Sequence, residues 1–397
     1  MRKTFLLLTM LFAATAYAQD ITNTIGANGF FYIKDAVNTF LRLNQTNGHI
    51  GIGTNVSATP RAQLEVGGTD GLLVTGTVNS GTVTALGAGV RLHWYPRKGA
   101  FRVGMAETTY WDDNGSSVTN MALYSIGMGY QARPTGVAST ALGAYNKATA
   151  DYSLSLGSYS NASGTHAIAL GTQVSASGIY SVAVGSGADT NGKDGSMVVG
   201  DDTYFQTSYS SADNQLTMRF SGGYRLWSSY PDSTAGVYMR HGQSGWSNYC
   251  DRNRKENFRE VDGEELLAKL RNIPVTEWNY KKTDPREKYI GPMAQDFYAA
   301  FHLGGTDSLG INSISIDGVN MAGIKALEKR TREIQATLRL VQEQNTALAE
   351  ENRILKKELA GMKDLSDEAA ALRSLKAELQ EQLKILKTRS PIELSHK

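Results

Sequence analysis

The 397-residue sequence contains one cysteine, Cys250. A single cysteine excludes a disulfide-stapled scaffold within the chain and a cysteine-based metal cluster. An excess of one charge is also missing, because 40 Lys and Arg residues balance 38 Asp and Glu residues. The composition therefore gives no reason to expect nucleic acid or an acidic membrane surface as a partner.

Enzyme motifs are missing as well. The sequence has no nucleophile elbow, P-loop, zinc-binding helix motif or complete dinucleotide-binding fingerprint. We therefore expect no cofactor and no metal, and nothing supports a conventional hydrolase. Beyond the N-terminal region, no stretch approaches the roughly 18 apolar residues of a membrane-spanning helix. We expect no membrane span in the mature chain.

Glycine and charge divide the chain near residue 250. Residues 1–250 hold 33 of the 41 glycines but only 29 of the 78 charged side chains. Two different kinds of structure are therefore joined there.

The first 18 residues have the pattern of a signal peptide. Arg2 and Lys3 precede the apolar residues 5–12, and Ala16–Ala18 supplies the small–x–small cleavage pattern. We expect cleavage before Gln19 and export without a lipid anchor, which predicts a secreted or cell-surface protein.

Glycine recurs at a fixed interval in the middle of the chain. Copies of a small–apolar–x–apolar–Gly motif end at glycines spaced by 14 residues, which are Gly129, Gly143, Gly157, Gly171 and Gly185. A repeat this short cannot bury a face alone, so we expect two short strands per copy, stacked on the next copy. We expect the glycines at turns that need positive φ or a close backbone approach.

Apolar residues alternate within each copy. Ile168 and Leu170, like Val182 and Val184, are two positions apart, which places each pair on one side of a strand. His166 occurs in one copy only and is expected in a surface turn. Residues 121–202 resemble the head repeats of trimeric autotransporter adhesins. That resemblance implies a wound parallel β-roll with three chains side by side.

Residues 19–120 precede the repeats. Gly48–Thr54 (GHIGIGT) and Ala62–Val66 (AQLEV) resemble a segment common in phage-fibre-like and secreted bacterial fibre proteins, which implies short strands and turns of a fibre shaft. Four aromatic residues here have two interpretations, a sugar-binding platform for a glycan ligand or packing across an interchain interface. They are Trp94, Tyr95, Tyr110 and Trp111. We favour packing.

The charged half opens with a series of short motifs. Cys250–Phe258 (CDRNRKENF) is followed by an amphipathic run at residues 266–270, a strand at residues 273–281 and the segment Ile290–Phe297 (IGPMAQDF). A helix is expected from about residue 320. Together, residues 250–330 resemble the C-terminal intramolecular chaperone of phage endosialidases and other tailspikes, a self-cleaving peptidase family. The resemblance implies trimer assembly by this domain.

In that family a Ser and a Lys five positions later cut the chain just before the Ser. Lys255 occupies the Lys position here, and Cys250 occupies the Ser position. A thiol is a good nucleophile, and a nearby ammonium favours the thiolate. Three interpretations stay open: a catalytic pair of Cys250 and Lys255, an uncleaved chaperone in which a buried Cys250 only packs, and an interchain disulfide.

A heptad pattern predicts a coiled coil over residues 331–390. Apolar residues and two asparagines follow spacings of 4 and 3 from Ile334 to Met362, and the phase breaks at residues 364–371. With Leu338 at an a position, Asn345 and Asn352 are also at a positions, which favours two strands. The resemblance upstream implies three strands, and we follow it. The flanking charges are expected to be solvated faces of the coil.

These observations predict a mainly β fibre or β-roll with a C-terminal α+β chaperone domain and an α-helical coiled coil. The expected segments are 1–18 (signal peptide), 19–120 (shaft), 121–202 (repeats), 203–249 (connecting β segment), 250–330 (chaperone) and 331–390 (coil). We expect an exported homotrimeric fibre-like protein whose chaperone drives assembly and is released by cleavage before Cys250. The alternative is an uncleaved surface adhesin whose head binds a host or matrix ligand. The length of the chain on a denaturing gel distinguishes the two.

Overall fold

The computed structural model describes residues 29–82, 85–113, 120–202, 207–231 and 234–388. The predicted signal peptide, residues 1–18, lies outside the described residues. The chain separates into two units, Met1–Cys250 and Asp251–Lys397. The division coincides with the change in glycine and charge content near residue 250.

A four-stranded sheet comes first in the chain. Its order is β1 (Phe30–Lys34), β2 (Thr39–Asn44), β3 (Ile50–Ile52) and β4 (Leu64–Val66). The fibre-like segment forms its last two strands, which run parallel and pair Ile50 with Leu64 and Ile52 with Val66.

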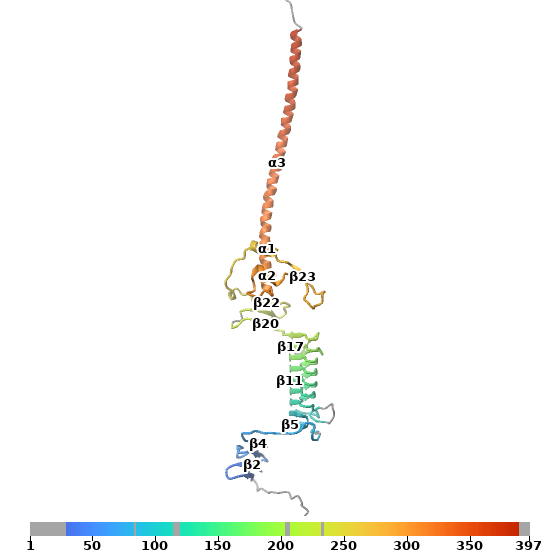
Figure 1. The fold of residues 1–397 in the computed structure, drawn as a ribbon, viewed down its shortest axis with the longest axis vertical. Coiled ribbons are helices and arrows are strands. Elements are labelled where there is room, and N and C mark those ends of the chain that lie inside the picture. The colour runs from blue at the N-terminus through green and yellow to red at the C-terminus, as the bar shows by residue number, and fades with distance from the viewer. Residues whose placement is uncertain (1–28, 83–84, 114–119, 203–206, 232–233, 389–397) are drawn as a thin grey trace, which may run out of the picture. The chain divides into compact units, whose positions relative to one another are not determined.

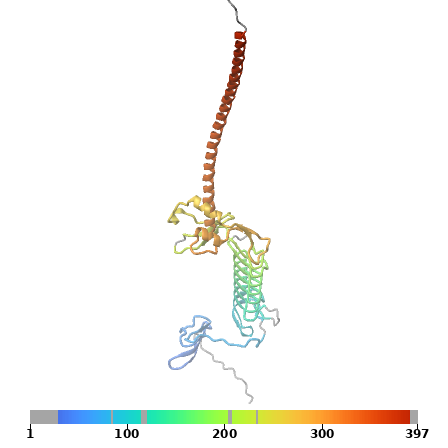
Figure 2. The ribbon, with the colours of Figure 1, turned by 45° about the horizontal axis from the view of Figure 1, so that its top comes forward.

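A β-solenoid built from two sheets follows (Figures 1 and 2). The larger sheet contains β5 (Gly89–Tyr95), β6 (Ala100–Ala106), β7 (Ile126–Tyr130), β9 (Thr140–Ala144), β11 (Leu154–Ser158), β13 (Ile168–Thr172), β15 (Val182–Ser186), β17 (Met197–Gly200) and β19 (Leu216–Arg219). The smaller sheet contains β8 (Arg133–Pro134), β10 (Lys147–Ala148), β12 (Asn161–Ala162), β14 (Ser175–Ala176), β16 (Ala188–Asp189) and β18 (Ser208–Tyr209).

The 14-residue period is the register of the solenoid. Leu154 pairs with Ile168 and Leu156 with Leu170 in parallel ladders, so each copy lies directly on the next. This confirms the predicted β-roll. Strands β5, β6, β18 and β19 continue the same sheets beyond residues 121–202 although they lack the repeat motif, because backbone hydrogen bonds need no particular side chain.

Small side chains fill the interior of the solenoid. Ala141, Ser155, Ala169 and Ala183 are all 0 % exposed. Buried Ser hydroxyls also donate to carbonyls in the turn three residues earlier, for example from Ser181 to Gly178 at 2.7 Å. Because the two sheets lie close together, nothing larger than these side chains fits between most of their strands.

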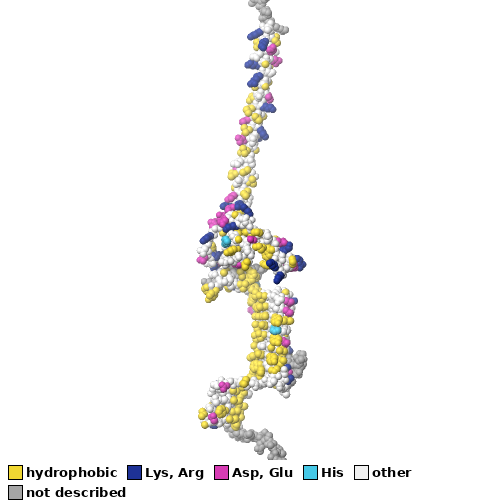
Figure 3. Space-filling view, viewed as in Figure 1, with side chains coloured by type: hydrophobic (Ala, Val, Ile, Leu, Met, Phe, Trp, Pro, Cys, Tyr) yellow, Lys and Arg dark blue, Asp and Glu magenta, His cyan; other side chains and the backbone are white. Residues whose placement is uncertain are grey.

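The larger apolar side chains lie on the outside of the solenoid. Residues next to a buried one along a strand point to the opposite face. Leu156, Leu170 and Val184 are accordingly only half-buried. Figure 3 shows hydrophobic side chains gathered in a column along the solenoid. We call the outward residues of β9, β11, β13 and β15 the apolar ridge.

Gly157 illustrates why the repeat glycines matter for stability. Its φ is +115°, and a Cβ atom there would lie 2.0 Å from the carbonyl oxygen of Gly171 in the next coil. We expect Gly157→Ala to lower the free energy of unfolding by at least about 2 kcal/mol, through backbone strain and displacement of the adjoining coil. Thermal denaturation followed by circular dichroism measures this change.

Gly192→Ala is the matched control. Gly192 also has positive φ, +69°, but a Cβ atom there meets no atom within 4 Å. Its cost should be limited to the left-handed backbone, about 1 kcal/mol. Equal losses in the two variants would contradict the role of close coil-to-coil approach.

The four aromatic residues before the repeats do not form one surface platform. Tyr95 and Trp111 belong to a buried cluster with Ala100, Ala106 and Met121. The Trp111 indole N–H donates to the carbonyl of Ala132 at 2.7 Å. The platform interpretation was therefore wrong for these two residues, because they pack within the chain. Trp94 is 41 % exposed, and Tyr110 packs against the edge of the cluster.

The second unit contains one long helix and two short ones. Its elements are the 3₁₀ helix η2 (Arg252–Arg254), α1 (Gly263–Arg271), β23 (Thr276–Trp278), β24 (Tyr289–Gly291), α2 (Ala294–Phe301) and α3 (Ser313–Thr388). Helix α1 confirms the amphipathic run. Helix α3 begins before residue 320 and continues through residues 364–371, because a break in the heptad phase does not break backbone hydrogen bonds.

Candidate functional site

Tyr249, the residue before Cys250, is fixed by aromatic packing. It follows an antiparallel sheet of β20 (Gly223–Trp227), β21 (Gly236–Arg240) and β22 (Ser247–Asn248). The Tyr249 ring stacks on Trp227 with centroids 4.3 Å apart and tilts against Tyr238 at 4.7 Å. Its backbone N–H donates to the Gly236 carbonyl at 3.2 Å. The amino side of the predicted cleavage bond is therefore held in place.

Cys250 is exposed in the structure. The interpretation of Cys250 as a buried packing residue is therefore wrong for this chain, because the sheet ends at Asn248 and nothing encloses the thiol. Exposure leaves the thiol accessible to chemistry.

Lys255 closes a short turn directly after Asp251. The Asp251 carboxylate accepts a hydrogen bond from the Asn253 backbone N–H at 2.9 Å and caps η2. The Lys255 N–H donates to the Arg252 carbonyl at 3.2 Å, and Lys255 itself is exposed. The turn thus shortens the path between positions 250 and 255. The pairing of the Cys250 thiol with the Lys255 amine stays a prediction.

A small apolar core holds the second unit together. Leu266 on α1, Phe297 on α2 and Val319 on α3 are each at most 6 % exposed and pack on one another. The Asp262 carboxylate caps α1 by accepting from the N–H groups of Glu264 and Glu265 at 2.8 and 3.2 Å. These interactions place the segment after Lys255 on the first turns of α3.

Helix α1 lies close to α3 at its beginning. A Cβ atom on Gly263 would lie 2.7 Å from that of Ala326, so a larger residue would push the helices apart. The Arg330 guanidinium donates to both carboxylate oxygens of Glu264, which lowers the pKa of Glu264. Above that pKa the pair links α1 to α3 with a specific geometry.

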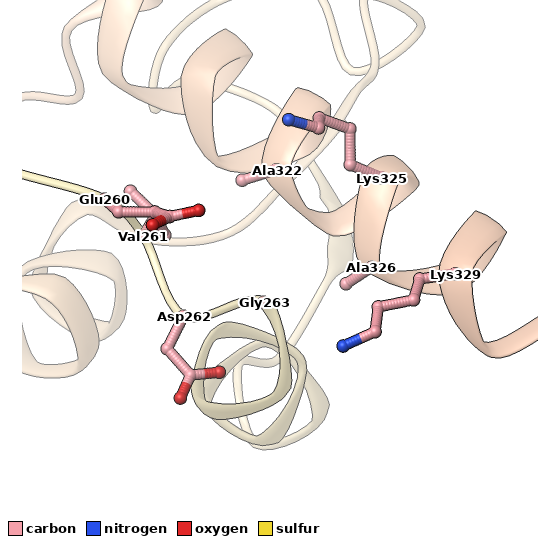
Figure 4. Close-up of a pocket in the computed structure, with 8 residues that line it drawn as sticks. All are labelled: Glu260, Val261, Asp262, Gly263, Ala322, Lys325, Ala326 and Lys329. Atoms are coloured by element: carbon pink, nitrogen blue, oxygen red, sulfur yellow. The ribbon is translucent and has the colours of Figure 1, made fainter.

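A cavity of about 620 Å³ lies beside this contact. It is lined by Glu260, Val261, Asp262, Gly263, Ala322, Lys325, Ala326 and Lys329. Figure 4 shows the two lysines on α3 across from Glu260 and Asp262, over a floor of small residues. Opposed charges around small residues favour a polypeptide surface as the occupant over a reaction centre. In the described part of the chain, no group of three His, Cys, Asp or Glu side chains could hold a metal ion.

These features define a parallel β-solenoid followed by a compact helical domain with a long exposed helix. Residues 250–305 match the family model described as the chaperone of endosialidase, and residues 135–160 and 162–188 match two copies of the YadA head domain repeat. The chaperone-type segment therefore follows head-type repeats in this chain, as the sequence resemblances predicted. The match begins at Cys250 itself.

Comparison of the chain with curated proteins and with solved structures found no match. Within residues 29–388, apart from the short stretches left undescribed, none of the helices has the length and apolar character to cross a membrane.

Sequence reasoning missed the residues that hold Tyr249. Trp227 and Tyr238 lie on different strands, 22 and 11 positions before Tyr249, and no spacing rule connects them. The available signal was only that an aromatic residue immediately precedes Cys250.

Proposed function

We propose that this chain is an exported, homotrimeric fibre-like protein whose C-terminal domain is an intramolecular chaperone for trimer assembly. The observation that carries the proposal is the apolar surface that a single chain leaves open on both units. The matches to head repeats and to the endosialidase chaperone support the same reading, and the repeats favour a location outside the cell or at its surface.

The apolar ridge supports association of the heads. Its Leu, Ile and Val side chains repeat in every coil at the same height, so they form a continuous stripe (Figure 3). A soluble monomer rarely leaves so long an apolar stripe in water. Packing three such stripes together would bury them without changing the fold of each solenoid.

The apolar seam of α3 supports association of the second units. Leu338, Leu348 and Leu355 are each 53 % exposed along a helix of 76 residues. A helix this long with a heptad seam is stable when partner helices cover the seam. Asn345 and Asn352 favour two strands, but the head-repeat match favours three chains, so we propose a trimer.

Assembly order follows from folding speed. Solenoid strands pair residues 14 positions apart and expose unpaired edges until the stack is complete, so the head is prone to aggregate while it folds. The helical domain depends more on local contacts and folds faster. Once three helical domains associate, the effective concentration of the three heads rises, and they fold in register.

A seam variant tests the trimer. Leu355→Asp should place three carboxylates at one layer of the coil, and like charges buried together are strongly unfavourable. We expect the wild-type protein to sediment as a trimer at equilibrium and the variant to shift to monomers at the same concentration. Lys357→Asp, on the solvated side of the same turn, is the control and should remain a trimer.

A clean wild-type dimer would disprove the trimer and restore the interpretation based on Asn345 and Asn352. A wild-type monomer would disprove association altogether, and the ridge would need another explanation.

We further propose that the chain is cut between Tyr249 and Cys250. The Cys250 Sγ attacks the Tyr249 carbonyl carbon, the amine of Cys250 leaves, and water hydrolyses the resulting thioester to a carboxylate and a thiol. Lys255 acts as the base for the thiol or as the charge that stabilises the thiolate. The exposed thiol, the fixed Tyr249 and the turn to Lys255 support this role. The intact mass of the purified protein tests cleavage and signal removal together.

A further inference from the structure

A second cavity, of about 450 Å³, opens at the edge of the solenoid near its first coils. Its walls come from the end of β6 and the starts of β8, β10 and β12. The residues that line it are Glu107, Thr108, Tyr110, Gln131, Arg133, Tyr145, Lys147, Tyr159, Ser160 and Asn161. Its volume is within the range of roughly 300–1,000 Å³ that is typical of small-molecule sites.

Gln131 gives this cavity a buried acceptor. The side chain is 5 % exposed, and its amide Nε2 donates to Glu107 Oε2 at 2.7 Å. That bond fixes the orientation of the amide, since a carboxylate accepts only from the nitrogen. The opposite atom, Oε1, is buried and accepts no hydrogen bond among the described residues. A ligand hydroxyl would satisfy it and remove the cost of the unpaired acceptor.

Arg133 and Lys147 give the cavity positive charge. The Arg133 guanidinium lies 3.9 Å from the ring centroid of Tyr110, and its buried Nε has no acceptor within the described chain. Glu107 is already engaged by the Tyr130 hydroxyl and by Gln131. A ligand carboxylate or sulfate would therefore find a planar donor and an ammonium without a competing anion.

The tyrosines present ring edges and hydroxyl groups. Tyr145 and Tyr159 are stacked with centroids 4.7 Å apart and planes at 15°, and Tyr130 packs edge-on against Tyr145 at 5.0 Å. Burial and the nearby Glu107 raise the pKa of Tyr145, so its hydroxyl remains a donor at neutral pH. Because stacking covers ring faces, this surface suits hydroxylated ligands better than a nucleotide base, which needs an open face.

We propose that this cavity binds an anionic saccharide, with the acidic group on Arg133 and Lys147 and a sugar hydroxyl on Gln131 Oε1. The site would make the head a carbohydrate receptor, which goes beyond assembly and requires no cleavage. It differs from the aromatic platform considered from the sequence, since of those four residues only Tyr110 lines it.

Isothermal titration of the full-length protein with tri-galacturonate tests the proposal. We expect saturable binding that weakens by about tenfold or more in Arg133→Met and in Lys147→Met, because each removes a charge-assisted contact. Lys147 is exposed, so its variant should fold even if the Arg133 variant does not. Lys193→Met, in a turn of the same solenoid outside the cavity, is the control and should bind as wild type does.

Three comparison ligands identify what is recognised. The methyl ester of tri-galacturonate and neutral maltotriose should bind much more weakly, since both lack the charge. Tri-glutamate carries the charge without the sugar and should also bind weakly. Equal binding of tri-glutamate would mean that the site reads charge alone. That result, equal binding of the ester, undiminished binding by the Lys147 variant, or no binding of tri-galacturonate, would overturn the proposal.

Discussion

Removing residues 251–397 is expected to leave the head unable to assemble. The remaining solenoid keeps its apolar ridge but loses the domain that brings three chains together, so partly folded strands meet at random and aggregate. We expect most of the truncated protein in the insoluble fraction. Any soluble part should sediment as a mixture rather than as one trimer. The measurement is the soluble fraction, followed by sedimentation equilibrium of that fraction.

The control for this prediction separates assembly from cleavage. Lys255→Ala retains the complete chaperone and lacks the proposed catalytic amine, so it should assemble into soluble trimers as wild type does. Residues 251–397 expressed as a separate chain should not rescue the truncated head, because the gain in effective concentration requires a covalent link. A truncated head that folds into soluble trimers on its own would show that the chaperone role is wrong.

The register of the solenoid could be predicted because it is written in one interval. Glycines every 14 residues allow only one way for identical copies to stack, and the structure pairs Gly157 with Gly171 accordingly. The side chains inside the solenoid were less accessible to prediction. Alternation places Ile168 and Leu170 together, but it does not say which side is interior. The spacing between the sheets decides, and it admits Ala169.

The aromatic residues before the repeats show a different limit. Trp94 and Tyr95 are neighbours on strand β5, so their side chains point to opposite faces and cannot form one platform. That argument was open to the sequence once a strand was assumed. The burial of Trp111 was not, because it depends on Ala132 and Met121, which approach it only in the folded chain.

For the candidate cleavage site, order and spacing were predictable and surroundings were not. The motif placed Cys250 and Lys255, and the match to the endosialidase chaperone begins at the same residue. The exposure of Cys250 follows from the end of β22 two residues earlier. The clamp on Tyr249 depends on the pairing of β20 with β21, which brings Trp227 and Tyr238 together.

The proposed cleavage should yield a C-terminal fragment that begins at Cys250. On this proposal, wild-type protein gives a head fragment ending at Tyr249, and Lys255→Ala gives only the full-length chain because no amine activates the thiol. Cys250→Ala should behave like Lys255→Ala. Cys250→Ser restores the residue of the resembled family and should retain cleavage. Denaturing electrophoresis and intact mass measure all four proteins.

Two controls make the result specific to this pair. Arg254→Ala removes the cation next to Lys255 and should leave cleavage unchanged, so a loss there would point to general charge rather than to the Lys255 amine. Alkylation of the denatured wild-type chain before refolding should block the cut, since the thiol is then covalently occupied. If wild type stays full-length while Cys250→Ser is cut, this chain has kept the chaperone and lost the peptidase. If neither is cut, the autopeptidase proposal fails, and an intermolecular disulfide seen on a non-reducing gel would then give Cys250 its role.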